Sequence, residues 1–387
     1  MLLNNNSFFL CLLIYIKVKC EIAIKGFYNQ GLGTVYIKGG LGTPLQDIYF
    51  TVDINLDINY VDSLDSNYDS SNSITFKKTN NYIKYSPKIE GYEAIEMISF
   101  HPDHYLTNWK FIFTQNSDNN TYTPFLGFGI GDESFINQLF TAGIIKQKTF
   151  CFNYSHIIID KEIEQSQELT KLKIIDNSKY FGYVNEVFFG KYSEEKETRT
   201  IIVPKDYNKV ELSNVKFLFS STKGNIHLPM KYFEIFKKLY FGEILWKECV
   251  EFQYYKGLII QCNKKMINNL PNVYLILEGN ILLQFSYLDL FEETVPYAPK
   301  LTFRISFENE LDNAVFGLSF LKAFNIIFDQ DKKEIIFPKS NKIHTLVITN
   351  IYFYSLFIIM ITNSCLLLFG FIIQLFCYIN KNTKLIE

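Results

Sequence analysis

The chain has 387 residues and a formal net charge of −2, and 20% of its residues are charged. This near-neutral balance argues against nucleic acid as a partner, because phosphate binding requires a basic face. Hydrophobic residues make up 48% of the chain, which excludes disorder as its overall state. A prior of roughly 100–200 residues per domain predicts two domains or lobes.

Residues 1–20 are predicted to form a signal peptide. Phe8–Ile16 is a short apolar run, and Lys17 and Cys20 follow it. Such a run is too short to span a bilayer and is typical of the apolar core of a signal sequence. A retained signal anchor is the alternative that the sequence leaves open.

The other end of the chain carries a second apolar segment, Ile351–Ile379, which has no charged side chain. About 20 apolar residues suffice to cross the hydrocarbon core, so 351–379 is predicted to be a transmembrane helix. Lys381 and Lys384 follow and place the tail, residues 380–387, on the cytoplasmic side by the positive-inside rule. The sequence therefore predicts a single-pass type I membrane protein of the secretory pathway or cell surface. Its body would be luminal or extracellular.

Three cysteines lie in the predicted luminal body, where disulfides are permitted: Cys151, Cys249 and Cys262. Cys249 and Cys262 are near enough in sequence to close a small loop, which would leave Cys151 as an unpaired, buried thiol. No Cys-x-x-Cys pair is present, so a zinc framework is not indicated. His101 and His104 form the only close histidine pair, and we interpret their segment as a surface loop. The sequence thus predicts neither a metal nor a cofactor.

Between its apolar ends, the chain has the pattern of a mostly β protein with a few short helices. Many short segments alternate or are continuously apolar, as strands are. Helical spacing is convincing in three segments, Ser134–Ala142, Met230–Tyr240 and Leu318–Phe324. The Gly-rich pieces Gly39–Pro44 and Gly127–Gly131 lack the context of nucleotide-binding loops, and we interpret each, taken singly, as a turn.

Taken in order, however, several segments of the first half resemble the pepsin-like aspartic endopeptidases. Gly42–Gln46 is similar to the family's strand-turn motif, GTPxQ. Val52–Val61 falls in register with the first active-site segment of the family, V-D-T-G-S-S-x-L-W-V. Thr123–Gly129 and Ser134–Phe150 resemble the family's DGILGLG strand and the helix that follows it.

The second half resembles the same family. Phe219–Pro229 aligns with its second active-site segment, L-D-T-G-T-S-L-I-x-L-P, and Phe316–Phe337 is similar to its closing segment. The resemblance implies two β-rich lobes, residues 26–190 and 191–340, that face each other across a peptide-binding cleft. The family's cysteine at the Cys262 position normally pairs, and the resemblance makes Cys249 its expected partner.

The family's chemistry requires two carboxyl groups that share a proton, because two like charges so close together cannot both ionise. Asp53 occupies the first position, but Ser220 occupies the second. A hydroxyl cannot serve as general acid or base near neutral pH, and losing such a group costs about 10²–10⁴ in rate. The resemblance therefore implies that catalysis is lost or severely reduced. We expect Asp53 to be an ordinary ionised carboxylate, hydrogen-bonded by Ser220 or paired with Lys223.

Residues beside both positions also depart from the family pattern. Asn55 and Thr222 replace glycines that let the backbone turn tightly, so we expect their Cβ atoms to distort the turns. The threonine that braces the two lobes is Ile54 in the first motif. Although Ser221 keeps a hydroxyl in the second, we expect the brace to be absent. Lys223 replaces a hydroxyl beside the second position.

Tyr85 matches the position of the family's flap tyrosine, although Ser86–Gly91 replaces the usual hairpin tip. The resemblance makes Tyr85, Ser221 and Lys223 candidates for contact with a peptide ligand.

Three functions from different classes remain open. The first is a membrane-anchored pseudoprotease that binds a peptide or protein in the cleft without cutting it, and the sequence favours it. The second is an active aspartic endopeptidase that uses Asp53 with Asp57 or another carboxylate. The third is a structural surface protein with a vestigial cleft. We expect a monomer. Asn119 and Asn153 begin glycosylation motifs, which an Asn-rich chain also yields by chance.

Overall fold

The computed structural model describes residues 21–29, 33–115, 123–153, 155–163, 169–174, 179–190, 208–254, 257–293, 298–338 and 343–345. The predicted signal peptide, transmembrane segment and cytoplasmic tail lie outside these residues, as does Asn119. Within the described ranges, no helix is long and apolar enough to cross a membrane.

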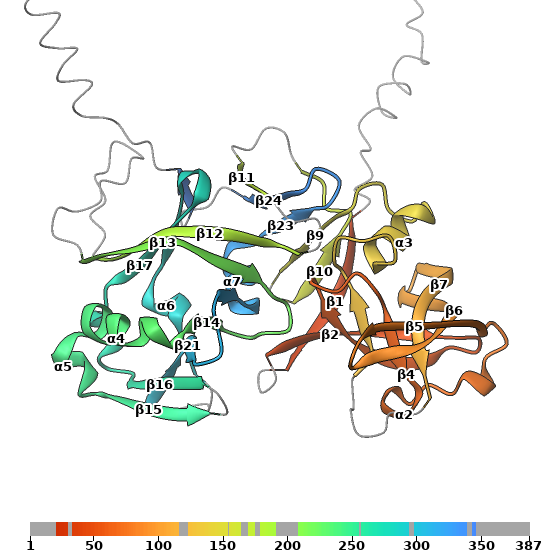
Figure 1. Cartoon of the computed structure of the whole chain (residues 1–387), viewed down its shortest axis with the longest axis horizontal. Coiled ribbons are helices and arrows are strands. Elements are labelled where there is room, and N and C mark those ends of the chain that lie inside the picture. Colours follow the sequence, from red (N-terminus) through yellow and green to blue (C-terminus); the bar gives the residue numbers. More distant parts are fainter. Residues whose placement is uncertain are drawn as a thin grey trace, which may run out of the picture. The chain divides into compact units, whose positions relative to one another are not determined.

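Two large sheets dominate the described part of the chain, which confirms the predicted mostly β class. Figure 1 shows the strands of the first half in red to yellow and those of the second half in green to blue. The 13-stranded sheet has the order β11-β24-β23-β9-β10-β1-β2-β3-β8-β4-β7-β6-β5. Its strands are β1 (Ile22–Asn29), β2 (Thr34–Leu41), β3 (Gln46–Asp53), β4 (Tyr60–Asp62), β5 (Lys77–Ser86), β6 (Ile89–His101), β7 (His104–Thr114), β8 (Phe125–Gly127), β9 (Thr149–Phe152), β10 (His156–Ile159), β11 (Thr170–Lys173), β23 (Ile327–Asp329) and β24 (Glu334–Phe337).

The second sheet has 12 strands in the order β19-β20-β16-β21-β14-β22-β13-β12-β17-β18-β25, with β15 paired to β16. Its strands are β12 (Phe181–Gly190), β13 (Asn208–Phe219), β14 (Ile226–Pro229), β15 (Cys249–Tyr254), β16 (Gly257–Asn263), β17 (Asn272–Leu277), β18 (Ile281–Phe285), β19 (Phe291–Glu292), β20 (Lys300–Phe303), β21 (Ile305–Glu308), β22 (Ala314–Phe316) and β25 (Ile343–Thr345).

Short helices connect the strands, and the three predicted helical segments are all confirmed. Ser134 caps the first of them by accepting a hydrogen bond from the backbone N–H of Asn137, which satisfies a free donor of the first turn. The α-helices are α2 (Ser63–Ser66), α3 (Phe135–Thr141), α4 (Phe233–Phe236), α5 (Gly242–Trp246), α6 (Tyr287–Leu290) and α7 (Leu318–Phe324). The remaining turns are the 3₁₀ segments η1 (Ser70–Asn72), η2 (Met230–Tyr232), η4 (Ile267–Asn269) and η5 (Glu278–Asn280), and the π-helical segment η3 (Lys237–Phe241).

The two halves repeat one arrangement around the candidate site. In the first half, β3 pairs in parallel with β8, and Asp53 at the end of β3 lies opposite Gly127. In the second half, β13 pairs in parallel with β22, and Phe219 lies opposite Phe316. Ser220 directly follows β13 as its chain turns away. In each half, the site residue therefore lies at or directly after the end of a strand that pairs in parallel with a strand further along the chain.

An aromatic core links the two sheets. Phe328 on β23 stacks on Phe150 of β9, with ring centroids 5.0 Å apart, and meets the edge of Phe219 on β13 at 5.8 Å. Aromatic pairs of this kind contribute about 0.5–1.5 kcal/mol beyond their burial. Strands β23 and β24 come from the end of the described body, yet they pair with β9 and β11 of the first half. The last part of the described body therefore completes the sheet that the first half begins.

The cysteines lie as predicted. Cys249 and Cys262 face each other across β15 and β16 and form a disulfide, with Cα atoms 4.0 Å apart. This separation is well inside the roughly 7 Å that a disulfide can bridge. Cys151 on β9 is a buried free thiol, and burial raises its pKa to about 11.

Candidate functional site

Asp53 is the last residue of β3, and hydrogen bonds hold both its backbone and its side chain. Its carbonyl accepts a hydrogen bond from the N–H of Phe128 at 2.8 Å, and its Oδ1 accepts from the N–H of Asn55 at 2.8 Å. Burial raises the pKa of Asp53, against smaller lowering effects from the Asn55 bond and the charge of Lys179. The carboxyl group therefore keeps its proton to higher pH than an exposed aspartate does.

The expectation that Ser220 or Lys223 holds the Asp53 carboxyl group is wrong, and the pKa of this group is raised and not ordinary. Among the described residues, its side chain forms neither a hydrogen bond with Ser220 nor an ion pair with Lys223. The cation whose charge acts on it is Lys179, an exposed residue just before β12. The sequence reasoning missed Lys179 because it belongs to a segment far from both site motifs.

Ser220 sits in a loop that repeats the side-chain hydrogen bond of the Asp53 loop. It is 4% exposed, and its Oγ accepts a hydrogen bond from the Thr222 N–H at 3.3 Å and lies 3.2 Å from the Thr222 hydroxyl. In both loops, the N–H two residues further on thus binds the site side chain. Neither Asn55 nor Thr222 adopts a positive φ. The predicted distortion by their Cβ atoms is therefore wrong, because this turn needs no left-handed residue.

Hydrogen bonds cross between the two loops. The Ser221 hydroxyl donates to the Val52 carbonyl at 2.7 Å and accepts from the Ile54 N–H at 3.0 Å. In the opposite direction, Asn55 Nδ2 donates to the Phe219 carbonyl at 2.8 Å. The prediction that the brace between the lobes is absent is therefore wrong. These contacts also place the Asp53 and Ser220 loops directly against each other, as the family resemblance implies.

Tyr85 ties the β5–β6 hairpin to the Asp53 loop. It lies near the hairpin tip, is 40% exposed, and donates its hydroxyl to Asp57 Oδ1 at 2.7 Å. Partial burial raises the pKa of Tyr85, and the carboxylates of Asp57 and Asp53 raise it further. The Tyr85 hydroxyl therefore lies within the electrostatic reach of Asp53. The same contact engages Asp57, the carboxylate that the endopeptidase alternative would need as a partner for Asp53.

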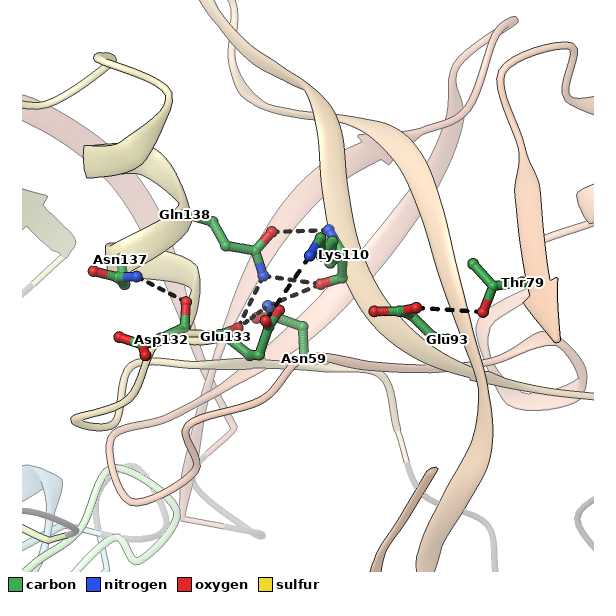
Figure 2. Close-up of polar contacts among 8 residues, drawn as sticks. All are labelled: Asn59, Thr79, Glu93, Lys110, Asp132, Glu133, Asn137 and Gln138. Atoms are coloured by element: carbon green, nitrogen blue, oxygen red, sulfur yellow. Dashed lines mark hydrogen bonds and ion pairs between the residues drawn. The ribbon is translucent and has the colours of Figure 1, made fainter. Parts of the chain in front are cut away.

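A buried asparagine that the sequence reasoning missed holds the Asp53 loop on its far side. Asn59 Nδ2 donates to the carbonyls of Lys110 and Glu133 at 3.2 and 3.0 Å, and its Oδ1 accepts from the Gly127 N–H at 3.1 Å. Gln138 on α3 bonds the same two carbonyls at 3.0 and 2.9 Å, as Figure 2 shows. No signal in the sequence singles out Asn59, since Asp or Asn occupies every second position from 53 to 59.

Beyond Ser220, the second loop leads to a polar cluster on β14 and β21. His227 Nδ1 contacts both Glu308 and the Ser306 hydroxyl, the latter at 2.9 Å. Burial lowers the pKa of His227; the Glu308 charge raises it and the charge of Lys223 lowers it. Because both contacts use one ring nitrogen, the imidazole cannot relay a proton from Ser306 to Glu308 as in a serine-hydrolase triad.

The paired strand crossings, the adjoining site loops and the hairpin over the first loop define the pepsin-like fold, and the chain has this two-lobed architecture. No model of a protein family and no curated protein sequence matches the chain. Among solved structures, it is similar to the crystal structure of basic 7S globulin from soybean, with a TM-score of 0.60 and 16% sequence identity. That match covers 83% of this chain and 96% of the soybean chain. At this identity, the likeness concerns the fold alone.

Across the described ranges, no group of three or more His, Cys, Asp or Glu side chains is placed to hold a metal ion.

Replacing Asp53 by asparagine is expected to stabilise the fold at neutral pH. Burial raises the pKa of Asp53, so the folded state binds this proton more tightly than the unfolded chain does. The cost of the buried charge is absent below the unfolded pKa of about 4 and grows as pH rises through the folded pKa. Urea midpoints should therefore be higher for Asp53→Asn than for the native chain at about pH 7, and equal near pH 3.

The matched control for this prediction is Asp47→Asn, which removes an exposed carboxylate from the same strand, one that pairs with Lys38. We expect its midpoint to stay close to the native value, because exposed ion pairs contribute little. A lower midpoint for Asp53→Asn than for the native chain at neutral pH would contradict the account.

Proposed function

We propose that this chain is a membrane-anchored, pepsin-like pseudoprotease that binds an extended peptide or protein segment between its lobes without cutting it. One observation carries the proposal. Ser220 stands at the position equivalent to Asp53, where the family resemblance implies a second carboxyl group, while the turns and the cross-lobe hydrogen bonds around it are present. The site thus retains its frame and has one carboxyl group instead of two.

The chemistry of that site favours binding over hydrolysis. Peptide hydrolysis by a carboxyl pair needs one group to activate water while the other protonates the leaving nitrogen. The Ser220 hydroxyl can do neither near neutral pH. Asp53, whose pKa is raised by burial, is suited to donate a hydrogen bond to a ligand carbonyl while it remains protonated.

The two alternatives have less support. An endopeptidase that pairs Asp53 with Asp57 would need Asp57 to be available, but its Oδ1 accepts the Tyr85 hydroxyl. A purely structural protein has no use for a hairpin residue held over the site, so the position of Tyr85 favours a binding role. The membrane anchor and luminal location remain part of the proposal on the strength of the apolar segments 1–20 and 351–379, and we propose no nucleic-acid partner.

A peptide-binding assay tests the proposal. Immobilised full-length chain in detergent is exposed to a library of extended peptides, and bound peptides are eluted and identified by mass. We expect intact peptides to be retained, and Tyr85→Ala to weaken their binding about tenfold through loss of a large contact ring. Tyr105→Ala is the matched control. Tyr105 is a 60% exposed ring near the β6–β7 turn, and Tyr85 lies near the β5–β6 turn at the opposite end of β6.

The outcomes separate the three functions. Retention of intact peptides that depends on Tyr85 but not on Tyr105 supports the pseudoprotease. Failure of the folded chain to retain any peptide would favour the structural alternative, and recovery of cleaved fragments would favour the endopeptidase.

A further inference from the structure

We infer that Asn55 is a positioning residue that has taken over one arm of the brace between the site loops, the arm that Ile54 cannot make. The inference deepens the proposed function, because it names the residue that fixes Asp53 relative to the opposite lobe. Its first support is the symmetry of the crossing bonds. Val52 and Phe219 each precede a site residue, and the carbonyl of each accepts a side-chain hydrogen bond from the opposite loop, at 2.7 and 2.8 Å.

The donors of these two bonds are not equivalent residues. In the second loop the donor is Ser221, the residue directly after Ser220. The equivalent residue of the first loop is Ile54, which is fully buried and whose side chain has no donor. Asn55, one position later, supplies the missing N–H from its side-chain amide. A buried carbonyl that loses its donor costs free energy comparable to a lost hydrogen bond, so this shift compensates for isoleucine.

Asn55 also holds the carboxyl group itself. Its backbone N–H donates to Asp53 Oδ1 at 2.8 Å, while its side chain reaches the Phe219 carbonyl. One residue therefore connects Asp53 to the opposite lobe. The Asn55 Oδ1 atom is buried and has no hydrogen-bond partner among the described residues, so the Nδ2 bond alone sets the orientation of the amide.

A swap of side chains between the two positions tests the inference. Asn55→Gly removes the donor and Ile54→Thr supplies a hydroxyl at the position equivalent to Ser221. We expect Asn55→Gly to lower the thermal midpoint by about 2–4 °C and Ile54→Thr alone to lower it as well, because it buries a surplus hydroxyl. The double variant Ile54→Thr/Asn55→Gly should recover a midpoint close to the native value.

A second measurement separates positioning from mere stability. The Asp53 carboxyl is followed by carbon NMR through a pH titration in each folded variant. With the brace broken, water reaches the carboxyl group, and its pKa should fall toward the ordinary value in Asn55→Gly; in the double variant it should return to the native value. Asn55→Leu, which keeps a similar side-chain size but removes the donor without adding a charge, should act like Asn55→Gly. Asn67→Gly is the control, because this exposed left-handed residue gains nothing from its side chain, and we expect no change.

Recovery of both the midpoint and the Asp53 titration in the double variant, including the case in which Asn55→Gly alone fails to fold, supports the inference. A double variant that is no better than Asn55→Gly, or an Asp53 titration that ignores Asn55, overturns it. Neither readout uses a ligand, so this result is independent of whether peptides bind.

Discussion

Replacing Glu96 by glutamine is expected to lower the free energy of unfolding by about 2–4 kcal/mol, because three donors converge on its buried carboxyl group. Glu96 lies on β6 and is 0% exposed. Its Oε2 accepts the Tyr68 hydroxyl at 2.6 Å, and its Oε1 accepts the Met97 N–H at 2.7 Å and also contacts the Thr75 hydroxyl. Glutamine would turn one acceptor oxygen into an NH₂ group that faces a donor, so at least one donor would lose its partner.

The matched control is Glu93→Gln on the same strand. The Glu93 side chain is half-buried and receives one long hydrogen bond from Thr79, at 3.3 Å, as Figure 2 shows. We expect this change to cost less than about 0.5 kcal/mol, as is usual for surface substitutions. Urea unfolding of both variants measures the difference, and equal costs would show that the Glu96 network contributes nothing of its own.

The Glu96 network also concerns the candidate site. It ties the 68–75 segment to β6, the second strand of the hairpin that carries Tyr85. The hairpin is therefore held at its base by Glu96 and at its tip by the Tyr85–Asp57 bond. Loss of Glu96 should therefore loosen the hairpin at its base and leave the Tyr85–Asp57 bond to hold the tip.

The order of short motifs along the sequence was enough to predict the fold. No single motif was specific, but each fixed the register of one strand or helix, and together they placed Asp53 and Ser220 in equivalent loops. The disulfide followed from the same alignment and from the lack of another partner for Cys262. These features depend on local pattern and chain order, which a sequence carries directly.

The polar contacts of the site were harder to predict because they depend on which atoms each side chain can reach in the folded structure. Motif comparison assigns the brace to position 54, but the side-chain amide of the asparagine at position 55 reaches the Phe219 carbonyl from one position further along the chain. The effect of Lys179 on Asp53 and the three hydrogen bonds of Asn59 join segments that are distant in sequence. Burial, which raises the pKa of Asp53, is likewise a property of the packed fold and cannot be read from neighbouring residues.

Peptide cleavage by the native chain is expected to be undetectable. The Ser220 hydroxyl cannot exchange a proton in the way a carboxyl group does, and losing such a group costs about 10²–10⁴ in rate, or more where two groups act as a unit. Asp53 alone can hold a water or a ligand carbonyl, but it has no partner to protonate the leaving nitrogen. This prediction carries the central claim, a pepsin-like site that has kept its frame and lost its chemistry.

The most direct test is a mass-spectrometric cleavage assay of the full-length chain against a peptide library, from about pH 3 to pH 7, the range in which carboxyl pairs titrate. Asp53→Ala and a statine-type transition-state mimic serve as controls. The account predicts the same fragment background for the native chain, the variant and the inhibited sample at every pH. Fragments that appear with the native chain, are suppressed by the statine-type mimic and are abolished by Asp53→Ala would contradict it and establish an active aspartic endopeptidase.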